Sequence, residues 1–131
     1  MSEEKRAGEA ERAREALAKI GGERAERHIM LCALSEKQKC CSPEQGARSW
    51  AYLKRRMKEL GLVDPQRDGG AVLRTKADCL QVCADGPIAV VWPDNFWYRG
   101  CTSHVLEEII QQHLLGGQPV EAHRLYAAPS A

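Results

Sequence analysis

The sequence predicts an α/β fold in which helices cover a four-stranded mixed sheet. Two segments with helical spacing of apolar residues alternate with short apolar runs that suit buried strands. The order is strand, helix, strand, then a strand hairpin and a second helix. A right-handed crossover makes the first two strands parallel, whereas a short turn makes the last two antiparallel.

The first strand is expected at residues 28–32, where an apolar run ends at Cys32. A helix is expected to follow Ser42, since Ser42 can act as N-cap, Pro43 suits the first helical position and Gln45 completes a capping box. The inner stripe of this helix is Trp50, Leu53, Met57 and Leu60, and Gly61 ends it.

Residues 71–77 alternate between two faces, as an outer strand would. A buried strand is expected at residues 88–92, with residues 97–99 as its partner across a turn. Thr102 can cap the last helix and Gly116 follows its end. The inner stripe of this helix is Val105, Leu106, Ile109, Ile110, His113 and Leu114. This β-α-β, β-β-α order is the thioredoxin-like topology.

A chain of 131 residues, 44% of them hydrophobic, can bury one core of ordinary size. We expect a charged N-terminal extension at residues 1–26, one domain at residues 27–122 and a C-terminal tail at residues 123–131. The extension is rich in Ala, Glu and Arg, which favours a solvated helix or a disordered segment.

The charges nearly balance, with 19 Lys and Arg against 18 Asp and Glu, so net charge predicts neither nucleic-acid nor membrane binding. Arg74, Lys76 and Arg99 could steer an acidic partner, although isolated basic residues are more often plain solvated surface. The N-terminus lacks the pattern of a secretory signal, which indicates a cytoplasmic protein. In a reducing compartment, cysteines favour metal binding or catalysis over disulfides.

The cysteines form two loops, each placed where a predicted strand ends. Cys32 and the Cys40-Cys41 pair bound the first loop, and Cys79 and Cys83 lie in the second. A [2Fe-2S] cluster needs four thiolates, two on each iron. Two loops with two ligands each suit that demand, so the pattern predicts an inorganic cluster and electron transfer.

Other uses of the cysteines fit less well. Structural zinc sites usually contain Cys-x2-Cys knuckles, which are missing here, so zinc remains a minority alternative. A thioredoxin-type dithiol would need Cys-x-x-Cys, and a Rieske centre would need His ligands close to the cysteines. Cys101, and one of the adjacent pair, can be inert buried thiols. No catalytic motif accompanies the histidines, which we interpret as surface or packing residues: His28, His104, His113 and His123.

Several segments together resemble the thioredoxin-like [2Fe-2S] ferredoxins of bacteria. They are residues 27–32, 39–41, 74–83, 86–91, 97–98 and 115–120. The resemblance implies a homodimer with one [2Fe-2S] cluster per subunit that carries single electrons between redox partner proteins and is not an enzyme. It also implies the cofactor ligands Cys32, Cys41, Cys79 and Cys83. The interval from Cys41 to Gly46 is one residue longer than in the family, which leaves Cys40 as an alternative to Cys41.

Three functions are compatible with these features. The first is a one-electron shuttle. The second is a cluster-bearing subunit of a larger dehydrogenase or hydrogenase complex, with the N-terminal extension as an anchor. The third is a zinc-stabilised interaction domain, which would be colourless and redox-silent.

Overall fold

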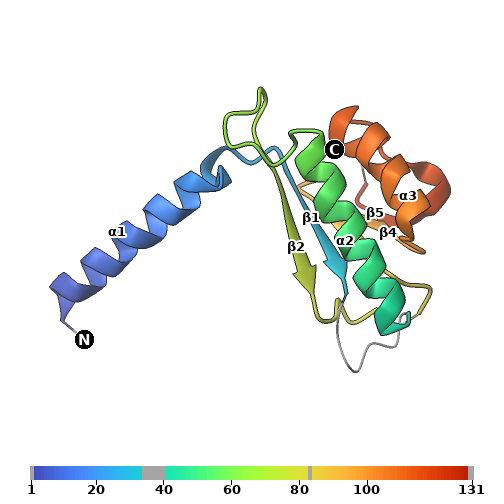
Figure 1. Cartoon of the computed structure of the whole chain (residues 1–131), viewed down its shortest axis with the longest axis horizontal. Helices are drawn as coiled ribbons and strands as arrows, with labels where there is room; N and C mark the ends of the chain where they lie inside the picture. The colour runs from blue at the N-terminus through green and yellow to red at the C-terminus, as the bar shows by residue number, and fades with distance from the viewer. Residues whose placement is uncertain (1, 34–40, 83, 130–131) are drawn as a thin grey trace.

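A computed structural model describes residues 2–33, 41–82 and 84–129, and its central feature is a five-stranded sheet in the order β2-β1-β3-β4-β5 (Figure 1). β1 pairs with β2 in parallel and with β3 in antiparallel orientation, and the β3-β4 and β4-β5 pairs are antiparallel. The strands are β1 (Arg27–Cys32), β2 (Val72–Ala77), β3 (Ala89–Trp92), β4 (Phe96–Tyr98) and β5 (Arg124–Ala127). The mixed sheet predicted from the sequence is thereby confirmed.

Two helical segments cover one face of this sheet. α2 spans Pro43–Glu59 and α3 spans Ser103–Glu108, and α3 continues into the π-helical segment η2, Ile109–Leu115. Alternate strand residues point toward these helices, which gives one contiguous core. The largest side chains of that core include Ile29, Leu31, Leu53, Met57, Tyr98, Leu106, Ile109, Ile110 and Leu114.

α2 begins as its sequence predicts. Ser42 is the N-cap, and its side chain accepts a hydrogen bond from the Gln45 N–H at 3.1 Å. Pro43 occupies the start of the helix, where its missing N–H costs nothing. Gly61 follows the C-cap with φ of +71°, a left-handed conformation that glycine adopts without strain.

The last helix differs from the prediction in its second half. Its buried residues come in adjacent pairs that recur every four positions: Val105-Leu106, Ile109-Ile110 and His113-Leu114. On a regular α-helix a four-residue repeat drifts by about 40° per repeat. Because η2 is a π-helix with more residues in each turn, it reduces that drift and keeps the last two pairs on the buried face. Thr102 is the N-cap by position, but its side chain makes no capping hydrogen bond.

The sheet contains one strand more than predicted, because part of the expected C-terminal tail forms β5. This segment pairs with β4, and all its residues except Ala127 are exposed. Its order comes from backbone pairing at the sheet edge and not from an apolar face. A segment with so little burial carries no alternating hydrophobic signal.

The N-terminal extension forms the helix α1, Glu3–Lys19, which contains no buried residue. Figure 1 shows α1 projecting away from the sheet, joined to β1 through the short turn η1, Gly22–Arg24. Ser2 caps α1 by accepting a hydrogen bond from the Lys5 N–H at 3.2 Å. The proposed domain boundaries at residues 26 and 122 stay a prediction. Within the described residues, no helix is both long and apolar enough to cross a membrane.

Candidate metal centre

The parallel pairing of β1 and β2 brings two cysteine-bearing chain segments to the same end of the sheet. Cys32 is the last residue of β1 and lies opposite Ala77, the last residue of β2. The Ala33 N–H donates to the Ala77 carbonyl at 2.8 Å, so the register holds to the end of the pair. Cys79 follows two residues later. Figure 1 shows the first turn of α2 at this same end.

Cys32 is held by the neighbouring segment that leads into β3. Its side chain is buried, and its Sγ accepts a hydrogen bond from the Ile88 N–H at 3.1 Å. The Cys32 N–H in turn donates to the Ile88 carbonyl at 2.9 Å. A backbone N–H directed at sulfur favours the thiolate over the thiol, which is the form that binds metals.

Cys79 has a similar amide donor in a different environment. Its side chain is exposed, and its Sγ accepts a hydrogen bond from the Gln81 N–H at 3.1 Å. Gln81 adopts φ of 64°, a left-handed conformation uncommon outside glycine and asparagine. The turn that directs this amide at the sulfur is therefore a strained one, and strained backbone concentrates at functional sites.

Cys41 lies directly before the N-cap of α2 and is half-buried. The first turn of a helix carries N–H groups without intrahelical partners and a partial positive charge. Both effects favour negative charge on a sulfur at this position. Two further candidate ligands, Cys40 and Cys83, lie outside the described residues.

The three candidate ligands that the structure describes, Cys32, Cys41 and Cys79, are not gathered into a closed site. In residues 2–33, 41–82 and 84–129, no group of three or more His, Cys, Asp or Glu side chains is arranged to hold a metal ion. The chemistry of the donor set nevertheless fits a thiolate-bound cluster, because Cys32 and Cys79 each accept an amide hydrogen bond at the same end of the sheet. The ligand assignment itself stays a prediction.

No sequence pattern marks the two residues whose amides donate to these sulfurs, Ile88 and Gln81. A backbone N–H is present at almost every residue, so no residue type marks it. The Gly86-Pro87 dipeptide before Ile88 is typical of a turn and does not indicate a donor to sulfur. Such donors become visible only when the strand pairing and the turn conformation are known.

Cys101 is completely buried close to Cys32 without being part of either loop. Its N–H donates to the Pro87 carbonyl at 2.8 Å. Burial, and to a lesser degree the neighbouring Cys32, raises the pKa of Cys101 far above that of an exposed thiol. A thiol held in the neutral form is chemically inert, in line with the packing role expected for Cys101.

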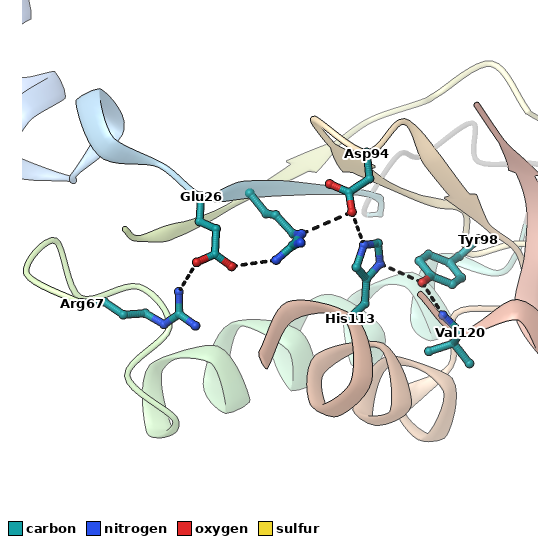
Figure 2. A network of polar contacts seen from close by, with 7 residues as sticks. Glu26, Arg67, Asp94, Tyr98, His113 and Val120 are labelled. Atoms are coloured by element: carbon teal, nitrogen blue, oxygen red, sulfur yellow. Dashed lines mark hydrogen bonds and ion pairs between the residues drawn. The ribbon is translucent and has the colours of Figure 1, made fainter. Parts of the chain in front are cut away.

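The opposite end of the sheet carries a polar network centred on the buried His113 (Figure 2). His113 Nε2 lies 2.6 Å from Asp94 Oδ2, and His113 Nδ1 lies 2.8 Å from the Tyr98 hydroxyl. The Val120 N–H donates to that hydroxyl at 2.9 Å. A neutral His113 with its proton on Nε2 satisfies every contact, and burial lowers the pKa of His113 accordingly.

Salt bridges extend this network to the start of β1. Arg27 contacts Asp94 at 3.3 Å and Glu26 at 2.6 Å, and Arg67 contacts Glu26 at 3.2 Å. Burial alone would raise the pKa of Asp94, but its hydrogen bond with His113 and the charge of Arg27 outweigh burial and lower it. The network ties four separate chain segments together, at residues 26–27, 67, 94–98 and 113–120.

The other histidines contact single partners at the surface. His28 Nε2 lies 2.7 Å from the Thr75 hydroxyl, and both His104 and His123 contact Glu108. The expectation that the histidines serve packing or surface roles agrees with these contacts.

No protein-family model matches the chain, but curated proteins do. A 2Fe-2S ferredoxin of Aquifex aeolicus (strain VF5) is 41% identical over 58 residues, which are 44% of this chain and 51% of that protein. A putative 2Fe-2S ferredoxin of Priestia megaterium is 26% identical over 99 residues, 76% of this chain and 69% of that protein. A 2Fe-2S ferredoxin of Clostridium pasteurianum is 36% identical over 50 residues. The chain spans about half the length of the first and third of these relatives, 51% and 49%.

Solved structures give a more complete match. The wild-type thioredoxin-like [2Fe-2S] ferredoxin from Aquifex aeolicus superimposes with a TM-score of 0.64 at 25% identity, covering 78% of this chain and 98% of that chain. A second structure of a thioredoxin-like [2Fe-2S] ferredoxin from the same organism gives a TM-score of 0.65 at 24% identity, covering 81% of this chain and 96% of that chain. The thioredoxin-like fold is thus confirmed, and the chain is similar in sequence and structure to bacterial thioredoxin-like [2Fe-2S] ferredoxins, as its sequence predicts.

Proposed function

We propose that the protein is a one-electron carrier whose [2Fe-2S] cluster is held by four cysteine thiolates. The expected ligands are Cys32, Cys41, Cys79 and Cys83, with Cys40 as the alternative to Cys41. When bound, such a cluster accepts and releases one electron. The observation that carries the proposal is the pair of backbone amides that donate to the sulfurs of Cys32 and Cys79 at one end of the sheet.

Cys32 and Cys79 have complementary roles in this site. Cys32 is buried and fixed by the β1-β2 and Cys32-Ile88 backbone contacts, so its position changes little when charge is added nearby. Cys79 is exposed, which leaves one side of the site close to the surface where a redox partner can approach. A rigid anchor and an exposed edge are what an electron carrier requires.

The assignment of Cys83 is supported by the solved relatives. Two of the similar structures are cysteine-to-serine variants of the Aquifex aeolicus thioredoxin-like [2Fe-2S] ferredoxin, substituted at positions four apart. Cys79 and Cys83 have this same separation. The agreement supports a pair of functional cysteines at this spacing.

Anaerobic purification followed by iron and acid-labile sulfide analysis tests the cofactor. We expect about two irons and two sulfides per chain, together with a paramagnetic signal after reduction by dithionite. A colourless protein that contains zinc and no sulfide would contradict the proposal and favour the interaction-domain alternative.

Four single substitutions test the ligand set. Cys79→Ala and Cys41→Ala are expected to abolish a stable native cluster, whereas Cys40→Ala and Cys101→Ala are expected to retain the visible absorption of the wild type. Cys101 serves as the matched control because it is a buried cysteine outside both loops. Loss of the cluster in Cys40→Ala with retention in Cys41→Ala would exchange the roles of the adjacent pair.

We also propose that the carrier is a homodimer, formed through the sheet face that α2 and α3 leave uncovered. Trp97 and Tyr126 lie opposite one another in register on β4 and β5. Trp92 lies on the same face of β3, two residues from Val90, which pairs with Trp97 and is itself buried. Trp92 and Tyr126 are 39% and 51% exposed. Contiguous aromatic surface of this kind is typical of protein interfaces. Light scattering should give twice the chain mass, reduced to the chain mass by Trp92→Glu.

One observation favours the alternative of a subunit in a larger oxidoreductase complex. α1 contains no buried residue and ends in the exposed apolar side chains Leu17 and Ile20, which suit a docking element. Affinity purification from the native host separates the two proposals, because a permanent subunit would co-purify with its oxidoreductase in fixed ratio. A cytoplasmic location is part of both proposals, since thiolate ligands require reducing surroundings.

A further inference from the structure

β2 is an outer strand of the sheet. On its outward edge the Val72 N–H already donates to the Leu62 carbonyl at 2.8 Å, so the backbone groups arranged to accept another strand begin at Arg74. The carbonyls of Ala71 and Ala77 accept hydrogen bonds from the β1 side, from the N–H groups of Glu26 and Ala33. In a parallel pair, every second residue directs both backbone groups toward the partner strand, and the residues that alternate with them direct both groups away. Ala71 and Ala77 belong to the inward set, and Arg74 belongs to the outward set. The N–H and carbonyl of Arg74 therefore point outward. No strand in the described part of the chain covers this edge.

A hollow of about 590 Å³ follows the same edge. Four consecutive β2 residues, 72–75, line it, and because neighbours on a strand point to opposite faces the hollow wraps around the edge. Its apolar wall includes Ile20 at the end of α1, Trp50 on α2 and Val63. This combination offers backbone hydrogen bonds in the middle and apolar contact on both sides.

The charge in this hollow is one-sided. Lys19, Lys54 and Arg74 line it, and no acidic residue does. Among the described residues none of these three cations forms an ion pair, in contrast to Arg56 and Arg99, which contact Glu107 and Asp85. Partial burial lowers the pKa of Arg74, which means that its charge is desolvated without an anion nearby to compensate.

We propose that the β2 edge binds an extended acidic segment of the electron-transfer partner, which adds to the sheet as a sixth strand. The mode is strand addition, in which main-chain hydrogen bonds supply affinity and side chains supply specificity. β2 runs toward Cys79, so a docked strand lies beside the candidate centre. This inference rests on the proposed function for the identity of the partner, while the edge, the hollow and its charge are properties of the chain alone.

A fluorescein-labelled peptide of alternating Glu and Val, titrated with the purified full-length protein, tests the proposal by fluorescence anisotropy. We expect binding that weakens as salt is raised, because the contacts are between exposed charges. Lys54→Glu should weaken binding about tenfold by replacing an attraction with a repulsion. Lys58→Glu makes the same charge change one turn further along α2, outside the hollow, and should change the affinity less than about twofold.

Two substitutions at Arg74 separate charge from backbone pairing. Arg74→Thr removes the cation and keeps the outward N–H, and should weaken binding about threefold. Arg74→Pro removes both, and should weaken binding a further fivefold or so because one hydrogen bond is lost. Proline fits this edge position, since the Arg74 N–H takes no part in the pairing with β1.

Three results would overturn the proposal: no binding of the acidic peptide to the wild type, equal binding of a peptide of alternating Lys and Val, or a chain dimer that Arg74→Pro separates. The last would mean that a second copy occupies the edge. Visible absorption and reduction by dithionite are recorded for every variant. An intact, reducible cluster without peptide binding refutes the docking proposal alone, whereas peptide binding by a chain that never loads a cluster refutes the proposed function alone.

Discussion

Replacing Tyr98 by Phe removes one hydroxyl group from the centre of the buried network. The Tyr98 side chain is completely buried, and its hydroxyl contacts His113 Nδ1 at 2.8 Å and accepts the Val120 N–H at 2.9 Å. Phenylalanine fills nearly the same volume, so the substitution leaves the packing with Phe96 intact. The effect of Tyr98→Phe is therefore confined to the two hydrogen bonds.

Both partners of the lost hydroxyl remain buried without a substitute. An unsatisfied buried polar group costs about 1–3 kcal/mol, and His113 can relieve part of its share by rotating toward Asp94. We expect Tyr98→Phe to lower the free energy of unfolding by about 2–4 kcal/mol. For a chain of this size 1 kcal/mol corresponds to about 3–4 °C in Tm, so the expected decrease is about 6–16 °C.

Thermal unfolding followed by circular dichroism measures this decrease. Tyr126→Phe is the matched control, because it removes the same hydroxyl from a tyrosine that is 51% exposed and makes no side-chain hydrogen bond in the described structure. Its Tm should stay within about 2 °C of the wild type. Equal Tm values for Tyr98→Phe and Tyr126→Phe would show that the hydroxyl of Tyr98 contributes nothing, and the interpretation of the network would be wrong.

Three other predictions concern pH and the spare thiol. Burial lowers the pKa of His113 below its ordinary value of 6.5, so the unfolded chain binds the proton more readily than the folded chain does. The Tm should therefore fall as pH decreases below 6.5. A constant Tm between pH 6.5 and 5 would contradict a buried neutral imidazole. The hydrogen bond from Arg56 lowers the pKa of Glu107 to about 2, so Glu107→Gln should lower the Tm at pH 7. The difference in Tm between Glu107→Gln and the wild type should shrink as pH falls from 4.5 toward 2. Cys101→Ala should keep the cluster absorption while unfolding at a lower temperature, since it leaves a small cavity in the core; equilibrium unfolding should show a loss of about 1 kcal/mol.

Local sequence chemistry predicted the elements that depend on near neighbours. The start of α2 followed from Ser42 and Gln45, and its end from Gly61, because capping involves residues at most a few positions apart. The parallel β1-β2 pair followed from the crossover rule, and with it the convergence of Cys32 and Cys79 at one end of the sheet. These predictions required no knowledge of distant contacts.

The features that the sequence could not predict depend on residues far apart in the chain. β5 is ordered by pairing with β4 and buries too little apolar surface to leave a pattern. The His113 network joins residues from four separate segments, none of which is marked by a motif. The choice between Cys40 and Cys41 depends on a loop path that neither composition nor spacing determines. In each case tertiary contacts decide the outcome.

The fixed register of β1 and β2 has a consequence for how such chains can diverge. Because the sheet sets the separation between Cys32 and the end of β2, residues inserted between Cys32 and α2 lengthen the loop without moving either strand. Loop closure becomes costlier only slowly, by about 0.6 kcal/mol for each doubling of length. A residue inserted within β2 would instead turn every later side chain to the opposite face. Homologues should therefore vary in length before α2 and keep the interval from Val72 to Cys79 constant.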